Sequence, residues 1–231
     1  MGIEPNIKNK FHIKQMEQCL RMEKMYEKFF KRLIDVILSL IGAIVLLPLF
    51  LLIGVAIFID NSGPIIFKQA RVGKDKKIFM LYKFRTMKVD APDVATHLLE
   101  NPDQYITRVG KILRKTSLDE LPQIYNILFD QMSIIGPRPV IALEEDLITE
   151  RDKYGVYSIK PGLTGWAQIN GRDEIGPILK AKLDAEYMEN ISFLFDVKCF
   201  FGTFLKVLKA DGIVEGKVEK QQESRKETVN Q

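Results

Sequence analysis

An uncharged stretch from Val36 to Ile59 constrains the fold of this chain more than any other feature. As a helix rising about 1.5 Å per residue it would be about 36 Å long, and the hydrocarbon core of a bilayer is about 30 Å thick. A secretory signal would be shorter and would end in small residues. An apolar core helix of this length would be unusual in a chain of 231 residues. The stretch therefore predicts insertion into a membrane.

The shape of the insertion is indicated by Pro48 and by the flanks. Pro48 lies near the centre, where it removes a backbone donor and predicts a kink. Basic residues mark the cytoplasmic side of a membrane segment. Here they lie on both sides: Lys24, Lys28, Lys31 and Arg32 before it, and Lys68, Arg71, Lys74, Lys76 and Lys77 after it. A re-entrant hairpin with both ends at the cytoplasmic surface satisfies both flanks, and a simple span is the alternative.

Charge and cysteine content exclude several classes of protein. The formal net charge of +4 is too small to indicate nucleic-acid binding. Beside a membrane segment, it is better explained by contact with anionic lipid headgroups. Two cysteines and two histidines provide no disulfide framework and no histidine-based metal site. This usage fits a reducing compartment.

The remaining pattern predicts an α+β protein. Its N-terminal re-entrant membrane helix hairpin precedes a small, mostly helical cytoplasmic domain that contains a β-hairpin. The predicted units are a polar leader over 1–28, the kinked membrane helix over 29–60, the cytoplasmic domain over 61–215 and a disordered tail over 216–231. The leader is either an amphipathic helix in part or a solvated segment.

The β-hairpin is predicted over Ile65–Val72 and Lys77–Met87, around a turn at 73–76. Alternation places Lys83 and Arg85 on one face of the second strand. Two cations on one face suit phosphate binding. A solvated edge strand is the alternative, and the side-chain pattern alone favours it.

Two acids lie at a predicted helix start between Thr116 and Gln123. Ser117 with Glu120 fits a capping box. Asp119 as the N-cap would instead place Pro122 in the first turn, where its missing donor costs little. In either arrangement the positive end of the helix favours ionised carboxylates. Asp119 is then either a plain cap or half of a functional acidic pair.

Two further loops carry arginines. Prolines on both sides of Arg138 restrict its backbone, and Arg172 ends a glycine-rich loop that starts at Lys160. The glycines of that loop let the backbone approach a ligand or another segment closely. Trp166 lies within it, either in the core or at a membrane interface.

Two helices are predicted near the C-terminus. They cover Pro177–Glu189 and Phe193–Lys209. The second is rich in phenylalanine, which suits docking on a membrane plane or burial in a core.

Five motifs in order resemble those of the bacterial sugar transferases, the monotopic polyprenol-phosphate phosphoglycosyl transferases. The resemblance covers Lys31 to about Glu215, and each motif is modest alone. The motifs are Lys-Arg-Leu-Ile-Asp at 31–35, Tyr-Lys-Phe-Arg-Thr-Met at 82–87, Arg-Lys-Thr-Ser-Leu-Asp-Glu-Leu-Pro-Gln at 114–123, Met-Ser-Ile-Ile-Gly-Pro-Arg-Pro at 132–139, and Lys-Pro-Gly-Leu-Thr-Gly at 160–165 with Asn-Gly-Arg at 170–172.

The resemblance implies a reaction. A UDP-sugar gives its sugar 1-phosphate to undecaprenyl phosphate, and UMP leaves. Asp119 would be the nucleophile and the ligand of a Mg²⁺ ion, and Glu120 its dyad partner. The substrate-binding cations would be Lys83, Arg85, Arg114, Arg138 and Arg172, with Arg85 taken from the strand face. One departure from the family is Leu47, where a serine often precedes the proline of the membrane helix.

Location and partners follow from the same resemblance. It implies the cytoplasmic face of the bacterial inner membrane and the first membrane step of capsule, exopolysaccharide or other glycan assembly. The sugar is expected to be an N-acetylated amino sugar. Other glycan-assembly enzymes or a second copy of the chain are candidate partners. A membrane-tethered, non-catalytic scaffold for polysaccharide assembly is the alternative function.

Overall fold

The computed structural model describes residues 25–92, 99, 101–171 and 175–209. It combines helices with two small, two-stranded sheets, which agrees with the mixed and mostly helical architecture expected from the sequence. The predicted disordered tail and most of the predicted leader lie outside the described residues.

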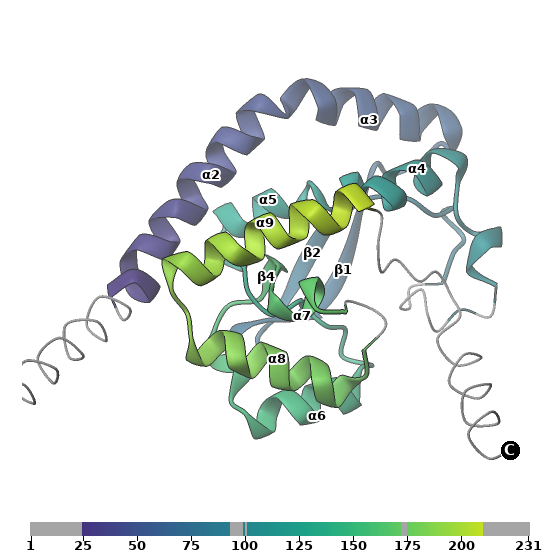
Figure 1. Cartoon of the computed structure of the whole chain (residues 1–231). Helices are drawn as coiled ribbons and strands as arrows, with labels where there is room; N and C mark the ends of the chain where they lie inside the picture. Colours follow the sequence, from purple (N-terminus) through teal and green to yellow (C-terminus); the bar gives the residue numbers. More distant parts are fainter. Residues whose placement is uncertain (1–24, 93–98, 100, 172–174, 210–231) are drawn as a thin grey trace, which may run out of the picture.

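The apolar stretch forms two helices that arch over the rest of the molecule (Figure 1). A π-helical turn at Tyr26–Phe30 leads into α2 (Lys31–Val45), and α3 covers Leu47–Asp60. The chain bends by 60° between them. The break lies at Leu46, two residues before Pro48, which occupies the first turn of α3. There its missing N–H costs little.

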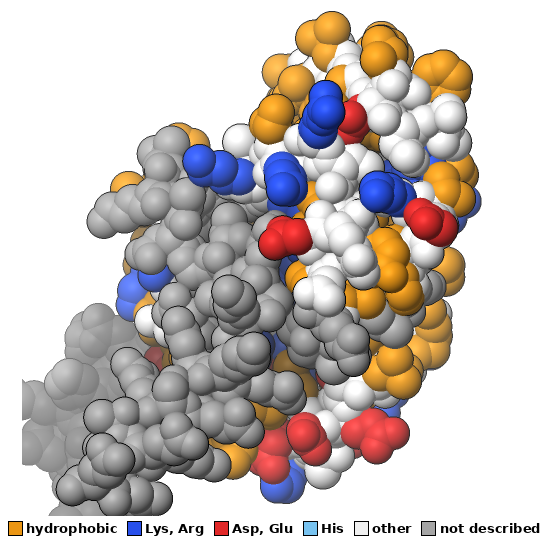
Figure 2. All heavy atoms as spheres, turned by 90° about the vertical axis from the view of Figure 1, so that its right-hand side faces the viewer, with side chains coloured by type: hydrophobic (Ala, Val, Ile, Leu, Met, Phe, Trp, Pro, Cys, Tyr) orange, Lys and Arg blue, Asp and Glu red, His pale blue; other side chains and the backbone are white. Residues whose placement is uncertain are grey.

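Some apolar side chains of this arch pack against the domain, and others are exposed. Within the described ranges, no helix taken alone has the length and hydropathy to cross a bilayer, whereas the bent pair meets that requirement jointly. Ile53 and Ile57 of α3 pack onto Phe84 and Leu113 of the domain. On the opposite side, Leu52 and other large apolar side chains of the arch are exposed. Figure 2 shows hydrophobic side chains gathered at the top of the molecule, with several lysines and arginines directly beneath them.

The predicted β-hairpin is present. β1 (Ile66–Val72) pairs with β2 (Ile78–Phe84) in antiparallel register, from Ile66 opposite Phe84 to Val72 opposite Ile78. A 3₁₀ turn at Lys74–Lys76 joins them, with Asp75 in the left-handed region at φ 52°. Asp is one of the few residues that adopt this conformation at low cost.

A second, parallel pair was not anticipated. β3 (Ser133–Ile135) pairs with β4 (Gly162–Thr164). A methyl group on Gly162 would overlap the backbone of Gly136, so the glycines of the 160–172 loop allow two backbones to meet. Asp35 of α2 accepts hydrogen bonds from the Ser133 hydroxyl (2.7 Å) and the Ile134 N–H (3.0 Å). The base of the arch is thereby fixed to this pair.

The other helices surround the strands. They are α4 (Arg108–Thr116), α5 (Gln123–Leu128), α6 (Glu145–Lys153), α7 (Trp166–Ile169), α8 (Pro177–Glu189) and α9 (Phe193–Lys209). Short 3₁₀ turns lie at Pro102–Gln104, Leu118–Glu120 and Val156–Ser158. In Figure 1, α6 and α8 lie side by side at the end of the molecule opposite the arch.

Trp166 is partly buried and packs against a core cluster that includes Tyr187. Its ring lies 4.9 Å from that of Phe195, and its Nε1 donates to Glu186 at 2.9 Å. α9 is divided: Cys199 is fully buried, while Phe200, Phe201 and Phe204 remain exposed. The predicted helix is therefore partly core and partly an exposed aromatic face.

Candidate active site

The two acids lie in a 3₁₀ turn between two helices. α4 ends at Thr116, its C-cap Ser117 has a left-handed backbone (φ 56°), and α5 begins after Pro122. Both predicted caps are therefore wrong, because Ser117 closes the preceding helix and Asp119 lies one turn before the next one. Leu118 and Leu121 pack with the α3 cluster, while Asp119 and Glu120 are each 9% exposed. The turn thus carries buried carboxyl groups without a capping role.

Glu120 is held by two cations from distant parts of the chain. The Lys83 ammonium on β2 donates to Oε1 at 3.0 Å. The guanidinium of Arg138 donates to Oε1 at 2.6 Å and to Oε2 at 3.3 Å. Paired hydrogen bonds between a guanidinium and a carboxylate fix orientation as well as charge. Glu120 therefore sets the positions of two cations beside Asp119.

The position of Lys83 shows that the interpretation of its strand face as a solvated edge is wrong. Its side chain is 19% exposed and faces the acidic turn, so β2 presents it to the site and not to solvent. Burial lowers the pKa of the Lys83 ammonium, and the Glu120 carboxylate opposes that change. An ammonium in this setting is a strong partner for a phosphate oxygen.

Asp119 has a different environment from its neighbour. Burial raises the pKa of the Asp119 carboxyl, and the charge of Lys83 is the largest influence that lowers it. Arg114 and Arg138 also lower this pKa, which places their charges near Asp119. None of the residues that the structure describes donates a hydrogen bond to the Asp119 carboxylate. Its oxygens are thus available for a new bond among several cations.

One predicted cation, Arg85, lies apart from this group. Arg85 is buried away from the dyad, where its guanidinium donates to the carbonyl of Asn61 at the end of α3. The alternation prediction placed it beside Lys83, but β2 ends at Phe84 and the backbone leaves the strand there. Arg172 lies outside the described residues. The structure therefore gathers Lys83, Arg114 and Arg138, and it assigns Arg85 to the junction with the arch.

A buried ion pair behind Arg138 was not found from the sequence. Arg151 of α6 donates to Asp184 of α8 through Nε at 2.9 Å and Nη2 at 2.6 Å. Its Nη1 donates to the carbonyl oxygen of Arg138 at 2.9 Å. Burial raises the pKa of Asp184, and Arg151 opposes the change. The pair ties two helices to the backbone that carries a site arginine.

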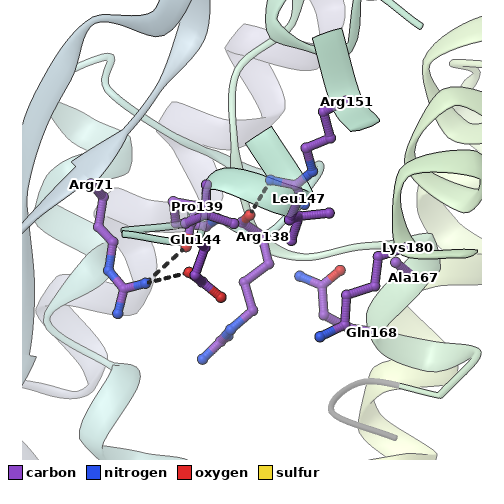
Figure 3. A pocket seen from close by; sticks show the side chains of 10 residues that line it. Arg71, Arg138, Pro139, Glu144, Leu147, Arg151, Ala167, Gln168 and Lys180 are labelled. Carbon is purple, nitrogen blue, oxygen red and sulfur yellow. Dashed lines mark hydrogen bonds and ion pairs between the residues drawn. The ribbon is translucent and has the colours of Figure 1, made fainter. Parts of the chain in front are cut away.

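Next to Arg138 lies a cavity of about 70 Å³ (Figure 3). Pro139, Val140, Leu147 and Ala167 supply its apolar wall. Its polar lining is Arg71, Arg138, Glu144, Arg151, Gln168 and Lys180. In Figure 3 the side chains of Arg138, Gln168 and Lys180 extend into the same space. Because Arg138 also contacts Glu120, the cavity adjoins the acidic turn.

A divalent cation at this turn would have few protein ligands. No cluster of three His, Cys, Asp or Glu side chains occurs in the part of the chain that the structure describes. Mg²⁺ is often held by one or two carboxylates together with substrate phosphates and water. Glu120 already accepts from Lys83 and Arg138, whereas the Asp119 oxygens accept from no described residue. The donor set fits a magnesium ion that arrives with a phosphorylated substrate.

Comparison with known proteins gives consistent matches. A family model described as bacterial sugar transferase matches residues 26–210. The uncharacterized sugar transferase EpsL of Bacillus subtilis is 45% identical over 153 residues, which cover 66% of this chain and 74% of that protein. UDP-glucose:undecaprenyl-phosphate glucose-1-phosphate transferase of Escherichia coli is 41% identical over 187 residues, 78% of this chain and 40% of that protein.

A third relative is named for an amino sugar. UDP-N-acetylgalactosamine-undecaprenyl-phosphate N-acetylgalactosaminephosphotransferase of Aeromonas hydrophila is 32% identical over 223 residues, 87% of this chain and 53% of that protein. The matched region therefore corresponds to 40% of the Escherichia coli protein and 53% of the Aeromonas hydrophila protein.

Proposed function

The chain belongs to the bacterial sugar transferase family, and from this premise we propose that it transfers a sugar 1-phosphate from a UDP-sugar to undecaprenyl phosphate, with release of UMP. The names of the relatives support the acceptor and the class of donor. One observation carries the proposal to this chain. It is the buried Asp119 carboxylate, which accepts no hydrogen bond from described residues and lies among the charges of Lys83, Arg114 and Arg138.

The first chemical step would form a covalent phosphosugar on the protein. An Asp119 oxygen attacks the phosphorus that carries the sugar, and the bond from that phosphorus to UMP breaks. Anion–anion repulsion opposes this attack. Phosphoryl transfer depends mainly on positioning and charge neutralisation. Lys83 and Arg138, which Glu120 holds in place, supply charge beside the reacting phosphate.

The second step would return the protein to its starting state. A phosphate oxygen of the polyprenol acceptor attacks the same phosphorus, and the bond to Asp119 breaks. The product is a lipid diphosphate sugar, and the two substrates need not be bound together. Mg²⁺, held by Asp119 and the donor phosphates, would neutralise charge on the diphosphate.

The location of the reaction follows from the acceptor, whose phosphate lies at headgroup level. We propose that α2 and α3 enter the inner membrane from its cytoplasmic face and return to it. The 60° bend, the exposed apolar side chains and the basic side chains beneath them (Figure 2) support this arrangement. Cysteines at the exposed positions Lys28 and Lys68, in a chain with Cys19 replaced by serine, test it by labelling. Accessibility from one side of the membrane supports a re-entrant hairpin, and accessibility from opposite sides indicates a span.

The native Cys199 does not disturb this labelling test. It is fully buried, and burial raises the pKa of its thiol to about 12. Alkylating reagents attack the thiolate, so this residue reacts slowly at neutral pH.

An assay of UMP release tests the reaction itself. Purified chain is given undecaprenyl phosphate, Mg²⁺ and one of several UDP-sugars. The sugar is proposed to be an N-acetylated amino sugar, and the panel includes UDP-glucose and UDP-galactose as competitors. Asp119→Asn is expected to release no UMP, while Asp146→Asn, at an exposed position on α6, keeps full activity. Absence of UMP release with every donor would favour the non-catalytic scaffold.

A further inference from the structure

The cavity beside Arg138 contains two polar side chains that the proposed reaction has not used. Both amide atoms of Gln168 are buried and have no hydrogen-bond partner in the described part of the chain. Buried amides without partners are costly, so they commonly bind a ligand or water. Lys180 lines the same cavity, and no described carboxylate lies within ion-pair distance of its ammonium. The pair therefore offers a charge and a hydrogen-bonding group, neither of which has a partner among the described residues.

The net charge of the lining favours an anionic ligand. The described lining has one acid, Glu144, and four basic residues, which are Arg71, Arg138, Arg151 and Lys180. Arg151 forms an ion pair with Asp184, and Arg138 forms one with Glu120. Arg71 lies 3.8 Å from Glu144. Lys180 thus supplies the positive charge for which the described lining provides no counter-charge.

The size of the cavity limits what can enter it. At about 70 Å³ it is well below the roughly 300–1,000 Å³ of pockets that enclose a drug-sized ligand. This suits a compact group such as a single phosphate better than a whole nucleoside or hexose. A ligand held here must therefore place one compact anionic group inside and extend the rest of its structure outward.

We infer that this cavity binds the phosphate of the departing nucleotide, with Lys180 and Gln168 as nucleotide-binding residues. The inference rests on the proposed function, because that reaction produces UMP next to Arg138. Arg138 connects the two places, since it contacts Glu120 and lines the cavity. Lys180 pairs with the phosphate charge, and the Gln168 amide donates to a phosphate oxygen.

A lipid phosphate has the same chemistry, but the location disfavours it. The lining comes in part from α6, α7 and α8, and Figure 1 places α6 and α8 at the end of the molecule opposite the arch. An acceptor anchored in the membrane would have to cross the domain to reach them. A soluble nucleotide reaches this end directly from water.

Calorimetric titration of UMP into the full chain in detergent tests the inference without turnover. Lys180→Met and Gln168→Glu are each expected to weaken UMP binding about tenfold or more, the loss typical of one charge-assisted hydrogen bond. Lys180→Arg keeps the charge and should retain most of the affinity. Lys182→Met is the matched control, because Lys182 lies exposed on the same helix, and it should bind UMP like the wild type.

Farnesyl phosphate, a short polyprenyl phosphate, provides the second arm of the experiment. Its affinity should be the same in all variants. UMP binding unchanged within twofold in both Lys180→Met and Gln168→Glu would overturn the inference, as would a loss confined to farnesyl phosphate. The proposed function fails separately: a wild-type chain that binds UMP through Lys180 but releases none from any UDP-sugar would refute only the reaction.

Discussion

Arg138 and Glu120 are joined by two hydrogen bonds, of 2.6 and 3.3 Å, between a loop after β3 and the turn before α5. The contact fixes a guanidinium next to Asp119 before any substrate arrives. The carbonyl of Arg138 is in turn held by Arg151, so both its backbone and its side chain are restrained. Such restraint is what a site needs when catalysis depends on positioned charge.

Arg138→Lys is expected to reduce kcat/KM for the UDP-sugar by about ten- to a hundredfold. Lysine keeps the charge but cannot form the paired hydrogen bonds to Glu120, and one charge-assisted bond contributes about 1.5–3 kcal/mol. Steady-state UMP release measures the effect. Lys160→Arg, in a partly exposed pair with Asp130, serves as a control that should leave the rate unchanged. Wild-type activity in Arg138→Lys would contradict a role for the paired contact.

The pH dependence of the reaction follows from the raised pKa of Asp119. The nucleophile must be ionised, so activity should fall on the acid side through a pKa above the usual value of about 3.9. Lys83 lowers this pKa, and Lys83→Met should therefore move the acid limb to higher pH in addition to reducing the rate. A kcat/KM profile against pH for both proteins measures the limb. A limb that moved to lower pH in Lys83→Met would contradict the assigned electrostatics.

The same pKa predicts an effect on stability. A carboxyl with a raised folded-state pKa stabilises the fold below its unfolded-state pKa, and this contribution is lost as pH rises through the folded-state value. Asp119→Asn removes the buried charge. It should unfold at a higher temperature than the wild type at pH 8, and the difference should shrink toward pH 4. Thermal unfolding at the two pH values tests this, and a less stable Asp119→Asn at pH 8 would speak against it.

Sequence patterns predicted the elements whose formation depends on residues close to one another along the chain. The hairpin, α8 and the bent apolar helix follow from local alternation, proline position and polarity. The burial of Lys83 could not be found in this way, because it depends on Glu120, which follows 37 positions later and is brought there by the fold. The predicted helix caps were wrong for a related reason. Ser117 and Asp119 have the composition of helix starts, but packing of Leu118 and Leu121 on α3 selects a 3₁₀ turn.

The role of the glycine-rich loop at 160–172 also could not be predicted from the sequence alone. Its composition fits both a ligand cradle and a close approach of backbones, and only the β3–β4 pairing distinguishes them. Gly162→Ala is expected to destabilise the protein by about 3 kcal/mol, at the upper end for overpacking, because its methyl group meets the Gly136 backbone. Gly176→Ala is the control, since a methyl group there has no neighbour within 4 Å. Chemical denaturation compares them, and equal stabilities would refute the packing role.

The buried pair of Arg151 and Asp184 predicts a large effect at a distance from the dyad. Asp184→Ala leaves a buried guanidinium without its partner, which typically costs about 3–5 kcal/mol. Asp152→Ala removes an exposed partner of Lys76 from the same region and should cost about 1 kcal/mol or less. Unfolding in urea measures both. A small effect in Asp184→Ala would show that the pair does not hold α6 and α8 together.

Intact-protein mass spectrometry of the chain incubated with Mg²⁺ and its UDP-sugar, without polyprenol phosphate, detects the proposed covalent intermediate. The wild-type protein should gain the mass of one phosphosugar, Asp119→Asn should gain none, and added undecaprenyl phosphate should remove the adduct. A wild-type protein that releases UMP only when the acceptor is present, and never carries the adduct, would contradict the role of Asp119 as nucleophile.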